Sequence, residues 1–145
     1  MLIPFTALPE IIRRYIGDTG GIAREFVPIK RPAGYRQRKA KACFDNCSEL
    51  ALDDRGKYCE GFAVSAESDA FAVHHAWITL DGIHAIDPTF KEPGAFYFGI
   101  EYDNHAVAKK ILAKPYMGDA QLDPSSPIIV LRINQARQSR EKDTQ

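Results

Sequence analysis

The sequence has little that would mark a membrane, secreted or strongly charged protein. No apolar run approaches the length of a membrane-spanning helix, so we expect no membrane association. Lys plus Arg and Asp plus Glu each total 19, a balance that gives no reason to expect nucleic acid as a partner. The opening stretch MLIPFTALPE is interrupted by Pro4 and Pro9 and lacks a basic segment, so it predicts no secretory signal and a cytoplasmic location.

Cysteine is also scarce, with single residues at Cys43, Cys47 and Cys59. An odd number of cysteines in a cytoplasmic chain argues against a disulfide framework. The spacings include neither Cys-x-x-Cys nor His-x-x-x-His, which argues against zinc. The Asp53-Asp54 pair lacks the alternating oxygen ligands of a calcium loop and is expected to end a helix. We therefore expect no metal and no cofactor.

The length of 145 residues fits one domain with one substantial core. Hydrophobic residues make up 45% and charged residues 26%, values that are ordinary for a globular protein. We assign residues 1–134 to a single domain. The polar stretch QARQSREKDTQ, residues 135–145, predicts a disordered tail.

Hydrophobic spacing divides the chain into helical and extended parts. Apolar residues at helical spacing predict one helix over about residues 7–16 and another from Cys43 to a turn that ends at Gly56. Two later helices are expected, one capped by Asn104 and one beginning at Pro127. Runs rich in aromatic and β-branched residues predict strands over residues 58–64, 74–80, 83–90 and 95–102. Helix, strand meander and helix in this order predict an α+β fold.

Basic residues gather in one segment, residues 30–41, with the sequence KRPAGYRQRKAK and no acid. It overlaps residues 22–35, whose prolines and glycine predict a loop with one short extended piece. A solvated loop explains such a run when it stands alone. Its position directly before Cys43 gives it a second interpretation, because nearby cations stabilise a thiolate.

Cys43 begins the second predicted helix. The positive end of the helix dipole and the preceding Lys39 and Lys41 favour the thiolate over the thiol there. Cys47 and Cys59 fall within a helix and a strand, where cysteine usually serves as a packing residue. A thiolate nucleophile needs a base within hydrogen-bond reach and a carboxylate that orients this base.

The stretch VHHAWITLDGIHAIDPTF, residues 73–90, supplies both groups. His75 is the candidate base, with His74 as the alternative, and Asp87 is the candidate carboxylate. Asp81 and Gly82 separate the predicted strands 74–80 and 83–90, and this Asp-Gly pair predicts a two-residue hairpin. Its strict register places Asp87 beside Ala76, on the opposite face from His75. A bulge or a longer hairpin that shifts the register by one residue is needed to bring His75 and Asp87 together.

Four short motifs occur in a fixed order over residues 37–90. They are Cys-Phe-Asp-Asn at Cys43, Tyr-Cys-Glu-Gly-Phe-Ala at Tyr58, His-Ala-Trp at His75 and Asp-Pro-Thr at Asp87. This set resembles the transglutaminase-like superfamily of cysteine proteases and acyltransferases. The resemblance implies a nucleophile-bearing helix packed on a small antiparallel sheet, the transglutaminase-like or papain-like core. It also implies Cys43 as nucleophile, His75 as general base and then acid, and Asp87 as the group that orients His75.

The resemblance also bears on the groups around the nucleophile. Gln37 precedes Cys43 by six residues, a spacing similar to the glutamine-to-cysteine spacing of papain-like enzymes, and is a candidate oxyanion donor. Asn46 and Tyr35 are alternatives, and the Cys43 backbone N–H is a candidate second donor. Trp77 shares the strand face of the candidate base, where it either walls the site or belongs to the core.

These features predict a cysteine hydrolase or acyltransferase that acts on a peptide, a small amide or a related acyl bond. Hydrolysis is the simpler reaction because it needs no second substrate pocket. Two alternatives stay open: a catalytically inactive binding or regulatory module of the same fold, and a protein that binds acidic partners through residues 30–41.

Overall fold

The structure, a computed structural model, describes residues 2–67 and 71–113. Within these residues it combines a six-stranded sheet with three α-helices, so the predicted α+β class is correct. The helix predicted from Pro127 and the polar tail 135–145 lie outside the described residues.

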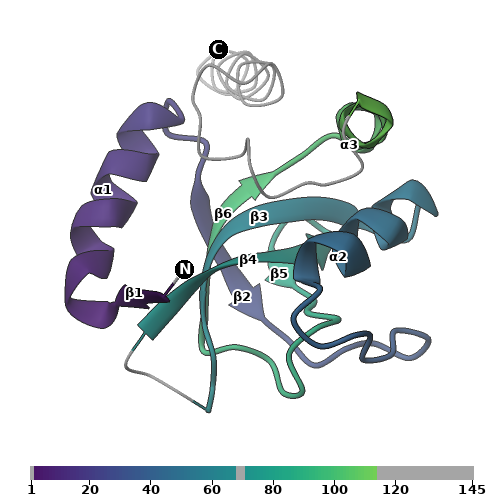
Figure 1. Cartoon of the computed structure of the whole chain (residues 1–145), viewed down its shortest axis with the longest axis horizontal. Coiled ribbons are helices and arrows are strands. Elements are labelled where there is room, and N and C mark those ends of the chain that lie inside the picture. The colour runs from purple at the N-terminus through teal and green to yellow at the C-terminus, as the bar shows by residue number, and fades with distance from the viewer. Residues whose placement is uncertain (1, 68–70, 114–145) are drawn as a thin grey trace.

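The sheet is mixed and curled (Figure 1). Its strands are β1 (Leu2–Pro4), β2 (Arg24–Pro28), β3 (Lys57–Val64), β4 (Phe71–Thr79), β5 (His84–Ala85) and β6 (Phe96–Glu101). They follow the spatial order β1-β4-β3-β6-β2-β5. Neighbours in these described strands are antiparallel except for β2 and β5, which are parallel. Strand β2 is the short extended piece expected in the loop region.

The helices form close to the positions that the hydrophobic spacing predicts. They are α1 (Leu8–Asp18), α2 (Cys43–Leu52) and α3 (Asn104–Ala113), and a short 3-10 helix, η1 (Phe5–Ala7), leads into α1. In Figure 1, α1 lies at the left of the view and α2 and α3 at the right, and all three helices contribute to one apolar cluster on the same face of the sheet. Helix α2 packs against β3, β4 and α3. None of the described helices combines the length and apolarity needed to cross a membrane.

Strand alternation divides the buried side chains between two apolar clusters. The larger cluster joins residues of the three helices to one face of β3 and β4, including Phe62 and Ile78. The smaller cluster uses the alternate residues and includes Trp77 and Tyr97. Because successive side chains of a strand point to opposite faces, His75 shares the face of Trp77.

The strands approach most closely beside His75. Gly61 of β3 pairs with His75 of β4 on one side and with Gly99 of β6 on the other. A Cβ atom on Gly61 would lie 2.1 Å from the carbonyl oxygen of Phe98, and one on Gly99 would lie 2.1 Å from that of Glu60. Both positions therefore require glycine, and the tight packing fixes the backbone that carries His75.

The connection from β4 to β5 differs from the predicted two-residue hairpin. Strand β5 pairs with β2, and the returning chain meets β4 at an antiparallel bridge between Ile78 and Ile86. The Asp81 carboxylate explains the longer loop, because its Oδ1 accepts hydrogen bonds from the N–H groups of Ile83 and His84, both at 2.9 Å. The prediction of a tight hairpin was wrong at this point.

Helix α3 is capped by Asp103 rather than by the predicted Asn104. Asp103 Oδ1 accepts hydrogen bonds from two N–H groups in the first turn, at 2.8 and 3.3 Å. Asn104 instead donates from Nδ2 to the carbonyl oxygens of Ala51 and Gly56, at 3.1 and 3.0 Å. It therefore ties α3 to the C-terminal end of α2.

Candidate active site

Cys43 is the first residue of α2 and follows an irregular segment, residues 29–42. Lys41 has a φ of 62°, a left-handed conformation that non-glycine residues adopt uncommonly. Such residues often occur beside functional sites, where the surrounding structure maintains the unusual backbone. The Cys43 N–H belongs to the first turn of α2, whose leading N–H groups have no partner within the helix. This turn can therefore donate hydrogen bonds to an anionic oxygen near the sulfur.

His75 and Asp87 come together because the register is shifted. The bridge between Ile78 and Ile86 lies one residue away from the predicted pairing, and its antiparallel continuation sets Asp87 opposite Trp77, on the face of His75. His75 Nε2 lies 2.8 Å from Asp87 Oδ2, and the two side chains are 4% and 2% exposed. The predicted juxtaposition of His75 and Asp87 is confirmed.

The Asp87 carboxylate accepts hydrogen bonds at both oxygens. Oδ1 accepts from the N–H groups of Thr89 and Phe90, at 2.9 and 3.0 Å. Oδ2 accepts from His75 and from the Tyr97 hydroxyl, the latter at 2.6 Å. Burial raises the pKa of Asp87, but the hydrogen bond and charge of His75, with the Tyr97 hydroxyl, outweigh burial and hold this pKa below its ordinary 3.8. Asp87 is therefore ionised and held in one orientation.

The His75 ring lies between a carboxylate, an aromatic ring and a sulfur. Phe90 stacks on it with ring centroids 4.1 Å apart and planes 17° apart. Burial alone lowers the pKa of His75, but its hydrogen bonds and charge interactions with Asp87 and with Cys43 raise this pKa from 6.5 to about 9. Because Nε2 faces Asp87, Nδ1 is the ring nitrogen that remains for Cys43.

The three cysteines differ in surroundings. Cys43 is 7% exposed, whereas Cys47 and Cys59 are 0% exposed. Burial, followed by the charge of Asp87, raises the pKa of Cys47 well above its ordinary value. Cys43 begins a helix, and its hydrogen bond and charge are among the interactions that raise the pKa of His75, so it is the candidate nucleophile by position and is the most exposed of the three.

The four side chains that the sequence placed around the nucleophile take different positions. Asn46 is buried, and its Nδ2 donates to the Lys39 carbonyl oxygen at 2.8 Å and to Thr89 Oγ1 at 2.9 Å. Both amide hydrogens are therefore used, which favours a positioning role over oxyanion binding. Gln37 is exposed and donates to the Thr89 carbonyl oxygen at 3.4 Å, so it lies beside the loop that carries Asp87.

Trp77 is fully buried and lies behind the site rather than at its surface. Its ring contacts Phe26 and Tyr97, with centroids 5.5 and 5.2 Å apart. It therefore supports Tyr97, the donor to Asp87. Tyr35, the other alternative oxyanion donor, directs its hydroxyl to the Arg55 carbonyl oxygen at 3.0 Å, away from the first turn of α2.

Three residues that sequence reasoning missed hold the site together. Tyr97 donates to Asp87 and accepts from the Gly94 N–H at 2.7 Å. Phe90 covers the His75 ring. Arg31 donates to the carbonyl oxygens of Asp87, Phe90 and Lys91, at 3.0, 2.8 and 3.1 Å. A buried tyrosine hydroxyl needs a partner, which is the one signal that could have pointed to Tyr97.

Within residues 2–67 and 71–113, no cluster of three His, Cys, Asp or Glu side chains is arranged to hold a metal ion. The chain matches no protein-family model, and comparisons with curated proteins and with solved structures find no significant similarity.

Proposed function

We propose that the protein is a cysteine hydrolase or acyltransferase that acts on an amide, peptide or related acyl bond. The observation that carries the proposal is the chain of contacts from Cys43 through His75 to the fully hydrogen-bonded Asp87. A nucleophile, a base and a group that orients the base are the parts that covalent acyl transfer requires. We also propose that the fold is transglutaminase-like, with the nucleophile at the start of a helix that packs on the sheet.

The acylation step depends on a positive charge on His75 beside the Cys43 sulfur. A raised pKa keeps His75 protonated at neutral pH, so it stabilises a Cys43 thiolate. The thiolate attacks the substrate carbonyl carbon, and a bond forms between sulfur and carbon. The bond between carbon and the leaving nitrogen then breaks, while His75 Nδ1 gives its proton to that nitrogen. The Cys43 N–H and the Gln37 amide are the proposed donors to the oxyanion.

The thioester step uses the same histidine as a base. Once the sulfur is acylated it carries no charge, so the contribution of Cys43 that raises the pKa of His75 is lost. His75 then accepts a proton from water as the water oxygen bonds to the acyl carbon. The carbon–sulfur bond breaks, and the thiolate is regenerated. An amine in place of water would give acyl transfer.

A simple activated ester tests this proposal. With p-nitrophenyl acetate we expect a burst of p-nitrophenol, acetylation of Cys43 detected by peptide mass, and slower turnover. Cys43→Ala should abolish the burst, and His75→Gln should slow acylation by at least about 100-fold. Hydroxylamine added as an acceptor should speed release if an amine can resolve the thioester.

Two histidine variants serve as controls. His84→Gln changes a half-buried histidine that pairs with Asp81, and His74→Gln changes the alternative base. Both should keep the burst. If wild type acetylates no cysteine, or acetylates all three equally, the protein is better described as an inactive module of this fold. If His74→Gln is the variant that loses the burst, the base has been misassigned.

A further inference from the structure

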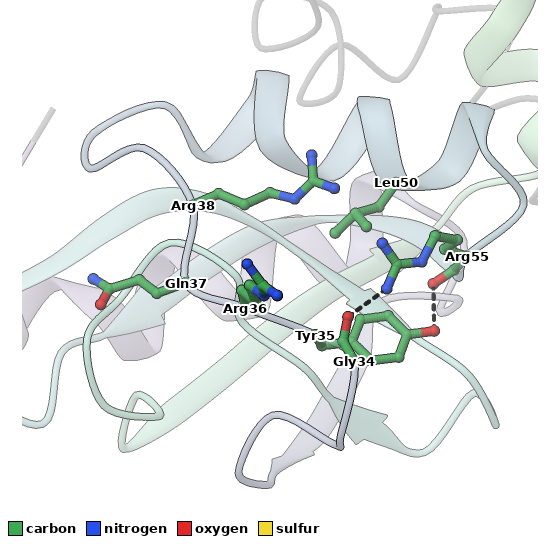
Figure 2. Close-up of a pocket in the computed structure, with 7 residues that line it drawn as sticks. All are labelled: Gly34, Tyr35, Arg36, Gln37, Arg38, Leu50 and Arg55. Carbon is green, nitrogen blue, oxygen red and sulfur yellow. Dashed lines mark hydrogen bonds between the residues drawn. The ribbon is translucent and has the colours of Figure 1, made fainter.

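A cavity of about 280 Å³ lies along the flank of α2, lined by residues 34–38, Leu50 and Arg55 (Figure 2). Three of the lining side chains are arginines, and none is acidic. Figure 2 shows the guanidinium groups of Arg36, Arg38 and Arg55 around the same space, with Leu50 above it. Its volume suits one acidic group and the short chain that carries it rather than a large cofactor.

The positive charge of this cavity is poorly neutralised by the protein. Among the described residues, Arg38 is the one arginine of the three with an ion-pair partner, Glu49 at 3.0 Å. The Glu49 side chain is 63% exposed, so this pair is weak and easily exchanged. No described carboxylate lies within ion-pair distance of Arg36 or Arg55.

Arg55 is held in place before any ligand arrives. Its Nη2 donates to the Gly34 carbonyl oxygen at 2.6 Å, and its guanidinium lies 4.8 Å above the centroid of the Tyr35 ring. Stacking leaves the edge of a guanidinium available for hydrogen bonds to a planar or tetrahedral anion. An ordered arginine loses little conformational freedom on binding.

Two residues that line the cavity also bond the loop that carries Asp87. Gln37 lines it and donates to the carbonyl oxygen of Thr89, and the Arg38 N–H donates to that of Pro88 at 2.7 Å. Leu50, which also lines it, is seven residues after Cys43 on α2. At 1.5 Å per helical residue, this position lies about 10 Å along the axis from Cys43.

We infer that this cavity binds an anionic group, carboxylate or phosphate, of the acyl substrate, about three extended residues from the bond that Cys43 attacks. The inference rests on the proposed function, which supplies the attack by Cys43. The arginines of the cavity supply the evidence for the anionic group. It names the substrate class of the site: acyl compounds or peptides with an acidic group at this distance. The basic segment 30–41 then serves substrate selection, through Arg36 and Arg38, as well as the environment of Cys43.

Three alkylating probes that differ in one group test the inference. They are iodoacetyl-glycyl-glycine extended by glutamine amide, glutamate α-amide or phosphoserine amide. We expect the glutamate or the phosphoserine probe to alkylate Cys43 at least about tenfold faster than the neutral probe, with the faster of the two identifying carboxylate or phosphate. Raising the salt concentration should reduce the preference.

Arg36→Gln is the main variant, because the structure gives the Arg36 side chain no hydrogen bond or ion pair within the described residues. It should reduce the preference to about twofold or less, whereas Lys30→Gln, which removes a charge from the same segment outside the cavity, should preserve it. Equal rates of all three probes in wild type would overturn the inference. So would an acidic preference that Arg36→Gln leaves intact.

A binding measurement separates this inference from the proposed chemistry. In Cys43→Ala, titration with inorganic phosphate and with glutarate should shift the amide resonances of residues 34–38 and Arg55 saturably in the millimolar range. Absence of saturable shifts would count against the cavity alone. Failure of iodoacetamide to select Cys43 would count against the proposed function alone.

Discussion

The two halves of the candidate site are held in different ways. The strand-borne half, His75 and Asp87, is buried, and each Asp87 oxygen accepts two hydrogen bonds. The helix-borne half, Cys43, follows an irregular basic segment that contains a left-handed residue, Lys41. Asn46 of the same helix bonds Thr89 of the other half.

The difference assigns the two halves different tasks. A buried ion pair is stable only when its remaining hydrogen-bonding groups are satisfied, so the strand-borne half fixes charge and orientation in advance. The helix-borne half borders the arginine-lined cavity, and residues 34–38 belong to both. Under the inference above, this half selects the substrate. Variants that weaken the strand-borne half should mainly lower stability. Variants that weaken the helix-borne half should mainly change the reactivity of Cys43.

Breaking the strand-borne half should have the largest effect on stability. Asp87→Ala leaves His75, the Tyr97 hydroxyl and two N–H groups without their acceptor, and we expect a loss of about 3–5 kcal/mol in the free energy of unfolding. Urea denaturation measures this loss. Glu10→Ala removes the exposed Glu10–Arg13 pair of α1, far from the site in sequence, and should cost much less. Equal losses would mean that burial does not distinguish the two pairs.

The buried pair also predicts how stability depends on pH. The pKa of His75 is raised from 6.5 to about 9, so its contribution is complete below pH 6.5 and is lost as the pH rises through 9. The pKa of Asp87 is lowered, so its contribution is present above 3.8 and is lost as the pH falls further. We expect wild type to lose on the order of 3 kcal/mol between pH 6.5 and 9.5 relative to His75→Gln. Parallel pH profiles of the two proteins would contradict this account.

Removing one donor to Asp87 should have an intermediate effect. Tyr97→Phe deletes the 2.6 Å hydrogen bond to the carboxylate and should cost about 1.5–3 kcal/mol, with a rise in the pKa of Asp87. Tyr102→Phe is the matched control, because the buried Tyr102 hydroxyl makes no hydrogen bond among the described residues. It should be close to neutral in urea denaturation. A control as costly as Tyr97→Phe would show that ring packing, not the bond to Asp87, is being measured.

Loosening the helix-borne half should cost the least stability but alter reactivity. Asn46→Ala removes the bonds to Lys39 and Thr89, with an expected loss of about 1–2 kcal/mol and a clear fall in the rate of Cys43 alkylation. Ser48→Ala, at another buried polar position of α2, removes a bond to the Asp45 carbonyl oxygen. Its alkylation rate should stay at the wild-type value. A rate unchanged in Asn46→Ala would rule out the positioning role.

Local patterns in the sequence were sufficient to predict the three described α-helices and to identify Cys43, His75 and Asp87 as residues that lie together. Apolar residues at helical spacing predict α1, and the same spacing predicts that α2 begins at Cys43. The ordered set of Cys43, His75 and Asp87 was also visible, and the structure brings these three side chains together. Their catalytic roles remain predictions.

The sequence could not reveal which strands pair with one another or in which register. The register between His75 and Asp87 depends on the Asp81 side chain, which bonds two backbone N–H groups and lengthens the loop. Tyr97 reaches Asp87 because β6 lies beside β3, and the order of strands in a sheet is not encoded in any local pattern. Arg31 looked like part of a solvated basic run, yet it binds three backbone carbonyl oxygens of the site loop.

The rate of iodoacetamide alkylation at each cysteine, measured against pH and mapped by peptide mass, tests the central claim most directly. We predict that Cys43 reacts much faster than Cys47 and Cys59 at neutral pH. In His75→Gln, its rate at neutral pH should fall at least about tenfold, because the thiolate loses its imidazolium partner. Slow and equal labelling of the three cysteines, or a Cys43 profile that His75→Gln leaves unchanged, would contradict the claim.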